Sequence, residues 1–205
     1  RSLESIKKGE VMRWLDTLDK SNSTKSTYVS CLKGLFVYAQ DRELINDQIR
    51  NPFQGINLGK NDKVSYKFME DDMLREIISK MTLNKHPHDA LIANLARSTG
   101  VRQGELFSSK IETHKGVVCL NVEDAKTLAG VRLVPIPDRL IESVTEAHPR
   151  WVAKGTGGAF SKRFGNAKAK VVQDRAIAFH SLRVTFITWA GNTENRWTEQ
   201  HIAWL

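Results

Sequence analysis

The chain has 205 residues, of which 40% are hydrophobic and 26% are charged, a balance typical of folded globular proteins rather than disordered ones. It contains no run of about 18 apolar residues, so a membrane-spanning helix is not expected. The formal net charge of +8 favours an acidic partner such as nucleic acid.

The first residues and the two cysteines bear on the location of the protein. The first residues, RSLESIKKGEV, are polar and lack the apolar segment of a signal peptide. No initiator Met precedes them, so we expect a piece of a longer protein. Cys31 and Cys119 each lie within an apolar pattern and are predicted to be reduced, buried core residues. These features indicate a cytoplasmic protein.

The N-terminal part reads as a helical bundle. Apolar residues recur at helical spacing over 3–19, and again over 27–44 after the polar stretch KSNSTKS. A short helix over 44–50 is expected to end before Pro52. We predict a helical domain over residues 1–57 and a polar, glycine-containing linker over 58–66.

The second domain is predicted over residues 67–205. Two amphipathic helices are expected over 69–82 and 87–99, with Gly100 as the C-cap of the second and a short helix near VRQGELFSS. Two β-rich runs within 116–137 predict a β-hairpin. Helix then returns, interrupted by the glycine-rich stretch AKGTGGAFSKRFG. The expected fold class is mainly α (α+β), with a small antiparallel sheet.

The stretch RAIAFHSLRVTFITWAG, residues 175–191, carries a candidate site. Its larger apolar side chains form one helical stripe, with His180 and Arg183 at the edge. Taken alone, this pair is weak evidence for an anion-binding site, and a structural role at the edge of the stripe is the favoured interpretation. The apolar stripe consists of Phe179, Leu182, Phe186, Trp189 and Ala190.

Two further segments favour anion binding. STGVRQGEL places Arg102 at a predicted helix start, where its guanidinium and the backbone N–H groups suit phosphate oxygens. Glu105 lies one turn later and is expected to hold Arg102. Lys126 falls in the predicted hairpin turn, within reach of a groove. Each of these residues also has a plain interpretation as a surface charge.

Two weaker motifs do not indicate a site. HPHD at 86–89 has His-x-His spacing but no accompanying ligands, so we predict a surface cluster at a helix start and no metal site. GTGG at 155–158 lacks the Lys-Ser/Thr of a phosphate-binding loop.

In their order, the segments TGVRQGEL, KTLAGVRLVPI and HSLRVTF resemble the catalytic domain of the tyrosine recombinases, the phage integrase family. The stretch STKSTYVSCLKGLFVYAQDRELINDQIRNPF looks like the helical, SAM-like core-binding domain of that family. The resemblance covers nearly the whole chain. It implies a DNA-binding domain over 1–57 and a C-terminally truncated catalytic domain over 67–205.

The resemblance also implies residue roles. Arg102 and Arg183 would clamp the non-bridging oxygens of the scissile DNA phosphate, and Glu105 would support Arg102. His180 would assist proton transfer at the nucleophile, and Lys126 would be the general acid for the departing 5′ oxygen. Preorganised cations stabilise such a transition state without a metal or another cofactor.

The chain departs from the family pattern near its end. The family carries a further His or Trp and then the nucleophilic tyrosine, whereas this chain ends at TEQHIAWL, where His201 comes too early for that role. Tyr28, Tyr38 and Tyr66 all lie in the first third of the chain and are not expected to be the nucleophile. We therefore expect the nucleophile outside this chain, and the chain itself to be inactive in cleavage.

The resemblance implies site-specific DNA recombination, such as viral genome integration, through a covalent 3′-phosphotyrosyl intermediate. The expected partners are double-stranded attachment sites and further copies of the protein on DNA, with no membrane, in the cytoplasm of a bacterial host. Two alternatives stay open: a non-catalytic DNA-binding protein of the same fold, and a type IB topoisomerase.

Overall fold

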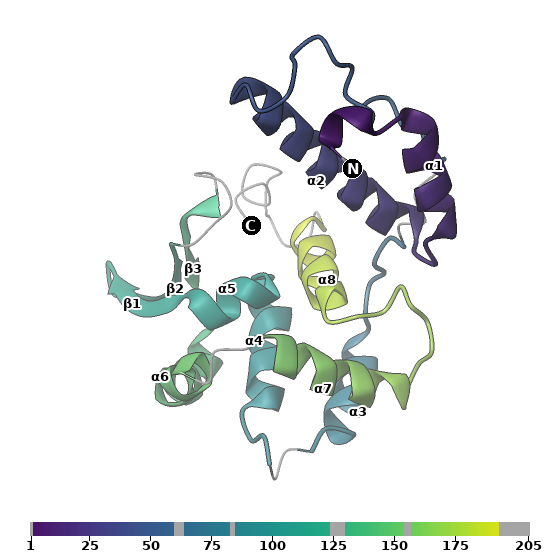
Figure 1. Cartoon of the computed structure of the whole chain (residues 1–205). Helices are drawn as coiled ribbons and strands as arrows, with labels where there is room; N and C mark the ends of the chain where they lie inside the picture. Colours follow the sequence, from purple (N-terminus) through teal and green to yellow (C-terminus); the bar gives the residue numbers. More distant parts are fainter. Residues whose placement is uncertain (1, 60–63, 83–84, 124–129, 154–156, 193–205) are drawn as a thin grey trace. The chain divides into compact units, whose positions relative to one another are not determined.

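The computed structural model describes residues 2–59, 64–82, 85–123, 130–153 and 157–192 (Figure 1). Helices dominate, with one small antiparallel sheet, so the predicted fold class is confirmed. The chain divides into two compact units, residues 1–64 and 65–205. Their assignment as a core-binding and a catalytic domain stays a prediction. No helix in the described ranges is both long and apolar enough to span a membrane.

The first unit contains a 3₁₀ turn, Leu3–Ser5, and the helices α1, Lys8–Thr17, and α2, Asn22–Asp41. The Ser21 hydroxyl caps α2 by accepting from the backbone N–H of Thr24 at 3.3 Å. The unit has its own hydrophobic core, formed by Val11, Leu15, Phe36, Ala39, Ile45 and Phe53.

Two predictions about the first unit are wrong. The segment 44–50 forms turns instead of a helix, because the Asn46 side chain accepts the backbone N–H of Gln48 at 2.9 Å and competes with helical bonding. Gln40 then donates to the carbonyls of Asp47 and Ile49, both at 3.0 Å. Cys31 is exposed, whereas Cys119 in the second unit is buried as predicted.

In the described part of the second unit, three helices precede a three-stranded sheet and three helices follow it. The elements that precede the sheet are α3, Asp71–Ser79; α4, Asp89–Thr99; and α5, Gln103–Ser108. The strands are β1, Lys110–His114; β2, Val117–Val122; and β3, Arg132–Pro135. The remaining helices are α6, Asp138–Ala153; α7, Gly157–Ala169; and α8, His180–Ala190.

The sheet has the strand order β1-β2-β3, with both pairs antiparallel. The β2–β3 pairing confirms the predicted hairpin, with Leu120 opposite Val134 and Val122 opposite Arg132. The strand β1 was not predicted, because KIETH lacks a clear apolar alternation. It joins β2 through a tight turn in which Lys115 and Gly116 both have positive φ, as a two-residue hairpin turn of type I′ requires.

Among the described residues of the second unit, one hydrophobic cluster extends from α3 to α8. The glycine-rich stretch is helical from Gly157 onward, contrary to prediction, because Phe160, Phe164 and Ala167 bury one face of α7. In α8 the predicted stripe is buried except for Trp189, which is 44% exposed.

Candidate functional site

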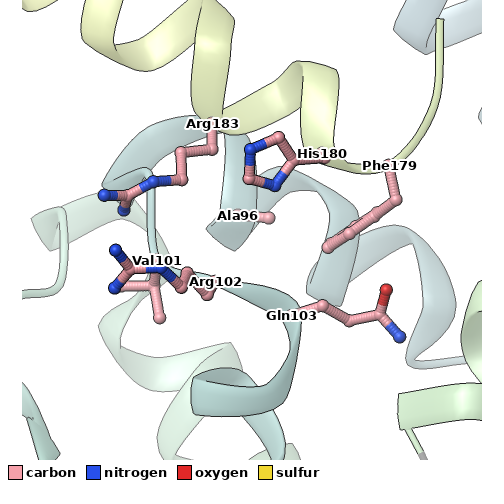
Figure 2. Close-up of a pocket in the computed structure, with 7 residues that line it drawn as sticks. All are labelled: Ala96, Val101, Arg102, Gln103, Phe179, His180 and Arg183. Carbon is pink, nitrogen blue, oxygen red and sulfur yellow. The ribbon is translucent and has the colours of Figure 1, made fainter. Parts of the chain in front are cut away.

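A small open pocket of about 60 Å³ lies beside α4, α5 and α8 (Figure 2). The structure brings three of the predicted site residues, Arg102, His180 and Arg183, together in its wall. The remaining lining residues are Ala96, Val101, Gln103 and Phe179.

The local sequence of α8 aims His180 and Arg183 at this pocket. The helix begins at His180, five residues later than the start of the stretch that the sequence suggested. Ser181 and Thr185 are fully buried on another side of α8. The Ser181 hydroxyl donates to the Ala176 carbonyl at 3.2 Å, and Thr185 Oγ1 accepts from the backbone N–H of Met69 at 2.8 Å. These bonds fix the rotation of α8, so His180 and Arg183 stay at the pocket.

Gly100 sets the turn between α4 and α5. It has φ of +64° and ends α4, as the sequence predicted, and a left-handed conformation of this kind favours glycine. A Cβ at this position would collide with the ring of Phe186. The Gly100 carbonyl accepts a hydrogen bond from Nη1 of Arg183. The turn therefore holds one guanidinium directly and begins the helix that carries Arg102.

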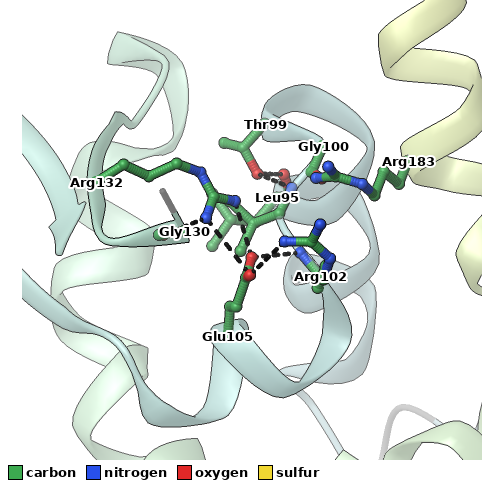
Figure 3. A network of polar contacts seen from close by, with 9 residues as sticks. Leu95, Thr99, Gly100, Arg102, Glu105, Gly130, Arg132 and Arg183 are labelled. Carbon is green, nitrogen blue, oxygen red and sulfur yellow. Dashed lines mark hydrogen bonds and ion pairs between the residues drawn. The ribbon is translucent and has the colours of Figure 1, made fainter. Parts of the chain in front are cut away.

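Glu105 is the centre of a buried ionic network (Figure 3). Its carboxylate accepts from the backbone N–H of Arg102 at 2.9 Å and from Nη1 of Arg102 at 2.8 Å. Arg132 donates to the same carboxylate from Nη2 at 2.8 Å and more weakly from Nη1 at 3.4 Å. Burial raises the pKa of Glu105, but the hydrogen bonds from Arg132 and Arg102 outweigh it and hold the pKa below its usual value. Glu105 is therefore ionised at neutral pH.

Arg132 is a site residue that the sequence motifs did not predict. A signal was present, because Arg132 and Val134 share one face of β3, and Val134 is buried. An arginine in the inward register of a short strand predicts a buried ion pair. Its Nη1 also donates to the Gly130 carbonyl at 2.8 Å, while its buried Nε has no hydrogen-bond partner within the described ranges.

The electrostatics of the pocket are strongly positive. Burial, followed by the charges of Arg102 and Arg132, lowers the pKa of Arg183 to about 10, so this side chain is still charged at neutral pH. Burial, followed by the charges of Arg183 and Arg102, lowers the pKa of His180. The described site thus combines three guanidinium groups, one carboxylate and an imidazole that is mainly neutral at pH 7.

Tyr66 lies against His180, with 4.9 Å between the ring centroids. The sequence placed this tyrosine in a linker. Its neighbour Lys67 is fixed twice, through its backbone N–H to the Ala176 carbonyl at 2.9 Å and through its ammonium to Asp174 at 2.8 Å. The segment that carries Tyr66 is thereby attached to the loop that leads into α8.

Lys126 and His201 lie outside the described residues. The expectation that backbone N–H groups of α5 would bind an anion is weakened, because α5 has only six residues and the Arg102 N–H is already bonded to Glu105. His86 and His88 line a different pocket. The described ranges contain no group of three or more His, Cys, Asp or Glu side chains suited to a metal ion.

The arrangement suits the binding of a tetrahedral anion. Two guanidiniums from separate elements offer planar, charged donors. A neutral imidazole beside them is able to accept a proton. Hydrogen bonds within the protein hold both guanidiniums, that of Arg102 to Glu105 and that of Arg183 to the Gly100 carbonyl.

No family model matches the sequence, and no curated protein does so significantly. Solved structures do match. A lambda integrase (75-356) dimer bound to a COC' core site has a TM-score of 0.70 at 18% identity, covering 93% of this chain and 76% of that one. A lambda integrase tetramer bound to a Holliday junction has a TM-score of 0.69 at 17% identity, and the match covers 98% of this chain and 63% of that one. This chain thus spans less than two thirds of that protein.

A Tn1549 transposon integrase in complex with circular intermediate DNA has a TM-score of 0.60 at 14% identity, covering 100% of this chain and 78% of that one. Sequence identities this low establish a shared architecture and leave the activity to be tested. The chain therefore has the fold of the lambda and Tn1549 integrases.

Proposed function

We propose that this chain is part of a DNA integrase of the tyrosine recombinase family, which cuts and rejoins DNA at specific sites. The observation that carries the proposal is the convergence of Arg102, His180 and Arg183 on one pocket in a chain with the integrase fold. The structural neighbours are bound to DNA, and the net charge of +8 suits the same ligand.

The chemistry is a phosphoryl transfer to a tyrosine. The phenolic oxygen attacks the scissile phosphorus, forms a 3′-phosphotyrosyl bond and displaces the 5′ oxygen. Arg102 and Arg183 bind the non-bridging oxygens and stabilise the charge of the transition state. His180 accepts the phenol proton, and Lys126 gives a proton to the departing oxygen. Rejoining reverses these steps with a 5′ hydroxyl from another strand.

We assign the nucleophile to a segment beyond the described residues. Tyr28 and Tyr38 belong to the unit that forms the proposed core-binding domain. Tyr66 lies against the imidazole of His180 and precedes α3, far in sequence from the C-terminal position that the family pattern requires. The same proposal includes self-association on DNA and integration of a phage or other mobile element in a bacterial cytoplasm.

The test is covalent capture on a nicked attachment-site duplex, followed by denaturing electrophoresis. We expect no adduct with the 205-residue chain, and an adduct with a chain extended through its natural C-terminus. Arg183→Ala in the extended chain should abolish the adduct. An extended chain that binds DNA without any adduct would refute the enzyme and support a non-catalytic DNA-binding protein.

Two further outcomes separate the alternatives. An adduct with the 205-residue chain that disappears in Tyr66→Phe would overturn the placement of the nucleophile. Relaxation of supercoiled DNA without preference for a site would indicate a type IB topoisomerase in place of an integrase.

A further inference from the structure

Arg132 and Arg102 share one carboxylate but differ in accessibility. The side chains of Arg132 and Glu105 are 7% and 8% exposed, whereas the side chain of Arg102 is 54% exposed. Arg132 is thus enclosed by protein, and of these two arginines only Arg102 is openly accessible to an incoming phosphate. Arg132 can therefore influence the pocket in two ways: by holding Glu105, or through the electrostatic field of its own charge.

The buried carboxylate of Glu105 needs a positive charge beside it, and Arg132 supplies that charge. A buried carboxylate with one guanidinium partner would neutralise that guanidinium and draw it inward. Glu105 here receives the Nη2 of Arg132 and the Nη1 of Arg102, each at 2.8 Å. Because Arg132 compensates the buried charge, the guanidinium of Arg102 is held through one of its nitrogens while its positive charge is not cancelled.

We propose that Arg132 is a positioning residue for the phosphate clamp. It fixes Glu105, and Glu105 in turn fixes Arg102 in the orientation that faces the pocket. This inference rests on the proposed function, because it assigns a second arginine to the support of the same clamp.

The charge of the assembly fits the reaction. Three guanidiniums and one carboxylate leave two excess positive charges in the described site. A phosphodiester carries one negative charge, and a second develops as the nucleophile's oxygen adds to phosphorus. An excess of two charges therefore favours the transition state over the ground state.

The chain offers a matched control for loss of a buried ion pair. Arg163 holds Asp89 through two hydrogen bonds at 2.6 and 2.7 Å, and that carboxylate is 5% exposed. Arg163 lines another pocket. Arg132→Met and Arg163→Met each leave one buried carboxylate without this partner, so both should lower the melting temperature. Only Arg132→Met should disturb the clamp.

The first readout needs no ligand. In the 205-residue chain, ¹⁵N relaxation of the Arg102 Nε–H group measures how firmly that side chain is held. We expect its order parameter to fall in Arg132→Met, to be largely restored in Arg132→Lys, and to stay unchanged in Arg163→Met. An unchanged order parameter in folded Arg132→Met would overturn the proposal.

The second readout is titration with inorganic phosphate, followed through the Nε–H shifts of Arg102 and Arg183. Arg132→Met should weaken phosphate binding about tenfold, as expected for a charged contact that loses its support. The same substitution should have little further effect in an Arg102→Met background. If Arg132→Met weakens phosphate binding just as much in the Arg102→Met background, then Arg132 acts through its own electrostatic field. That result would refute the positioning role.

The two proposals fail in different ways. Absence of any phosphate-induced shift at Arg102 and Arg183 in the unmodified chain would count against the clamp, and hence against the proposed function. The relaxation experiment would still decide whether Arg132 orders Arg102.

Discussion

The protonation of His180 depends on neighbours that come from three parts of the second unit. Tyr66 covers one side of the imidazole, and the guanidiniums of Arg183 and Arg102 face it across the pocket. Burial is the largest influence on its pKa, and the two positive charges act in the same direction. A neutral imidazole at pH 7 is the form that accepts a proton from a nucleophile.

Removal of the Tyr66 ring should raise the pKa of His180 toward the ordinary value. Tyr66→Ala exposes the imidazole to water, while Arg183 and Arg102 still keep the pKa somewhat low. Tyr66→Phe keeps the ring and should leave the pKa unchanged. The measurement is an NMR pH titration of the imidazole signals, with His180→Gln used for assignment. A pKa that is the same in all three proteins would contradict the role given to Tyr66.

Protonation of His148 should destabilise the fold in mild acid. This side chain is buried beside Trp151, and burial lowers its pKa. The unfolded chain therefore binds more protons below the ordinary histidine pKa, so stability is complete above about pH 6.5 and falls as the pH decreases, by at most about 1.4 kcal/mol per pH unit for this group. His180 contributes with the same sign.

The check is urea unfolding at several pH values from about 7.5 to about 5.5. His148→Gln should flatten the pH dependence, whatever its effect on stability at neutral pH. An equally steep dependence in His148→Gln would show that other groups cause it.

At the scale of elements, the α4–α5 turn sets the positions of the two arginines of the proposed phosphate clamp. The same glycine ends α4, receives the Arg183 guanidinium and lies under the ring of Phe186. Three constraints thus meet at Gly100, and any side chain there must displace α8 or the turn.

Gly100→Ala should lower the free energy of unfolding by more than about 2 kcal/mol. The left-handed conformation alone costs roughly 1–2 kcal/mol for a residue with a Cβ, and the clash with Phe186 adds to it. Gly165→Ala is the control, because it lies within α7 with open space around it. That change should be neutral or stabilising by up to about 1 kcal/mol. If Gly100→Ala and Gly165→Ala changed the free energy of unfolding equally in urea titrations, the role given to Gly100 would be contradicted.

At the scale of the whole molecule, the described residues form two hydrophobic clusters, one in each unit. The cluster of the first unit is small and centres on Phe36, which is 1% exposed. A small core leaves little reserve of stability. Each unit is therefore expected to respond to the loss of its own core residues.

Phe36→Ala should unfold the first unit and leave the second folded. A buried Phe→Ala change costs about 3–5 kcal/mol, which is comparable to the whole stability of a small unit. The indole NMR signals of Trp14 and Trp151 report on the two units separately during urea titration. Phe164→Ala is the reciprocal control in the second unit. A joint shift of both signals in either variant would show a single cooperative unit.

DNA affinity should fall steeply with salt, because bound duplex releases counterions from each phosphate that the protein neutralises. Arg183→Ala removes one of the proposed phosphate contacts, so the slope of log affinity against log salt should change by no more than about one. Arg150→Ala, which removes an exposed charge on α6, is the control. Fluorescence anisotropy with a labelled duplex, repeated at several salt concentrations, measures the affinity and its salt dependence for each protein. Salt-independent affinity would refute electrostatic binding.

The sequence by itself determined the features that depend on near neighbours in the chain. Hydrophobic periodicity located α2, α3 and α4, and the left-handed preference of glycine located the end of α4 at Gly100. The Arg102–Glu105 pair spans one helical turn, so its spacing alone predicted the contact that the structure contains. Each of these features depends on interactions between residues that are close in the chain, so the sequence was sufficient to predict it.

Only the tertiary structure decided what lies around the pocket. Packing against distant segments started α8 at His180, made a helix of the glycine-rich stretch from Gly157, and turned Trp189 outward. Tyr66 and Arg132 reach the site through long-range contacts with His180 and Glu105. Burial of a charge or a ring depends on which surfaces meet after folding, and that is settled by the summed packing of the whole unit and not by the residues on either side.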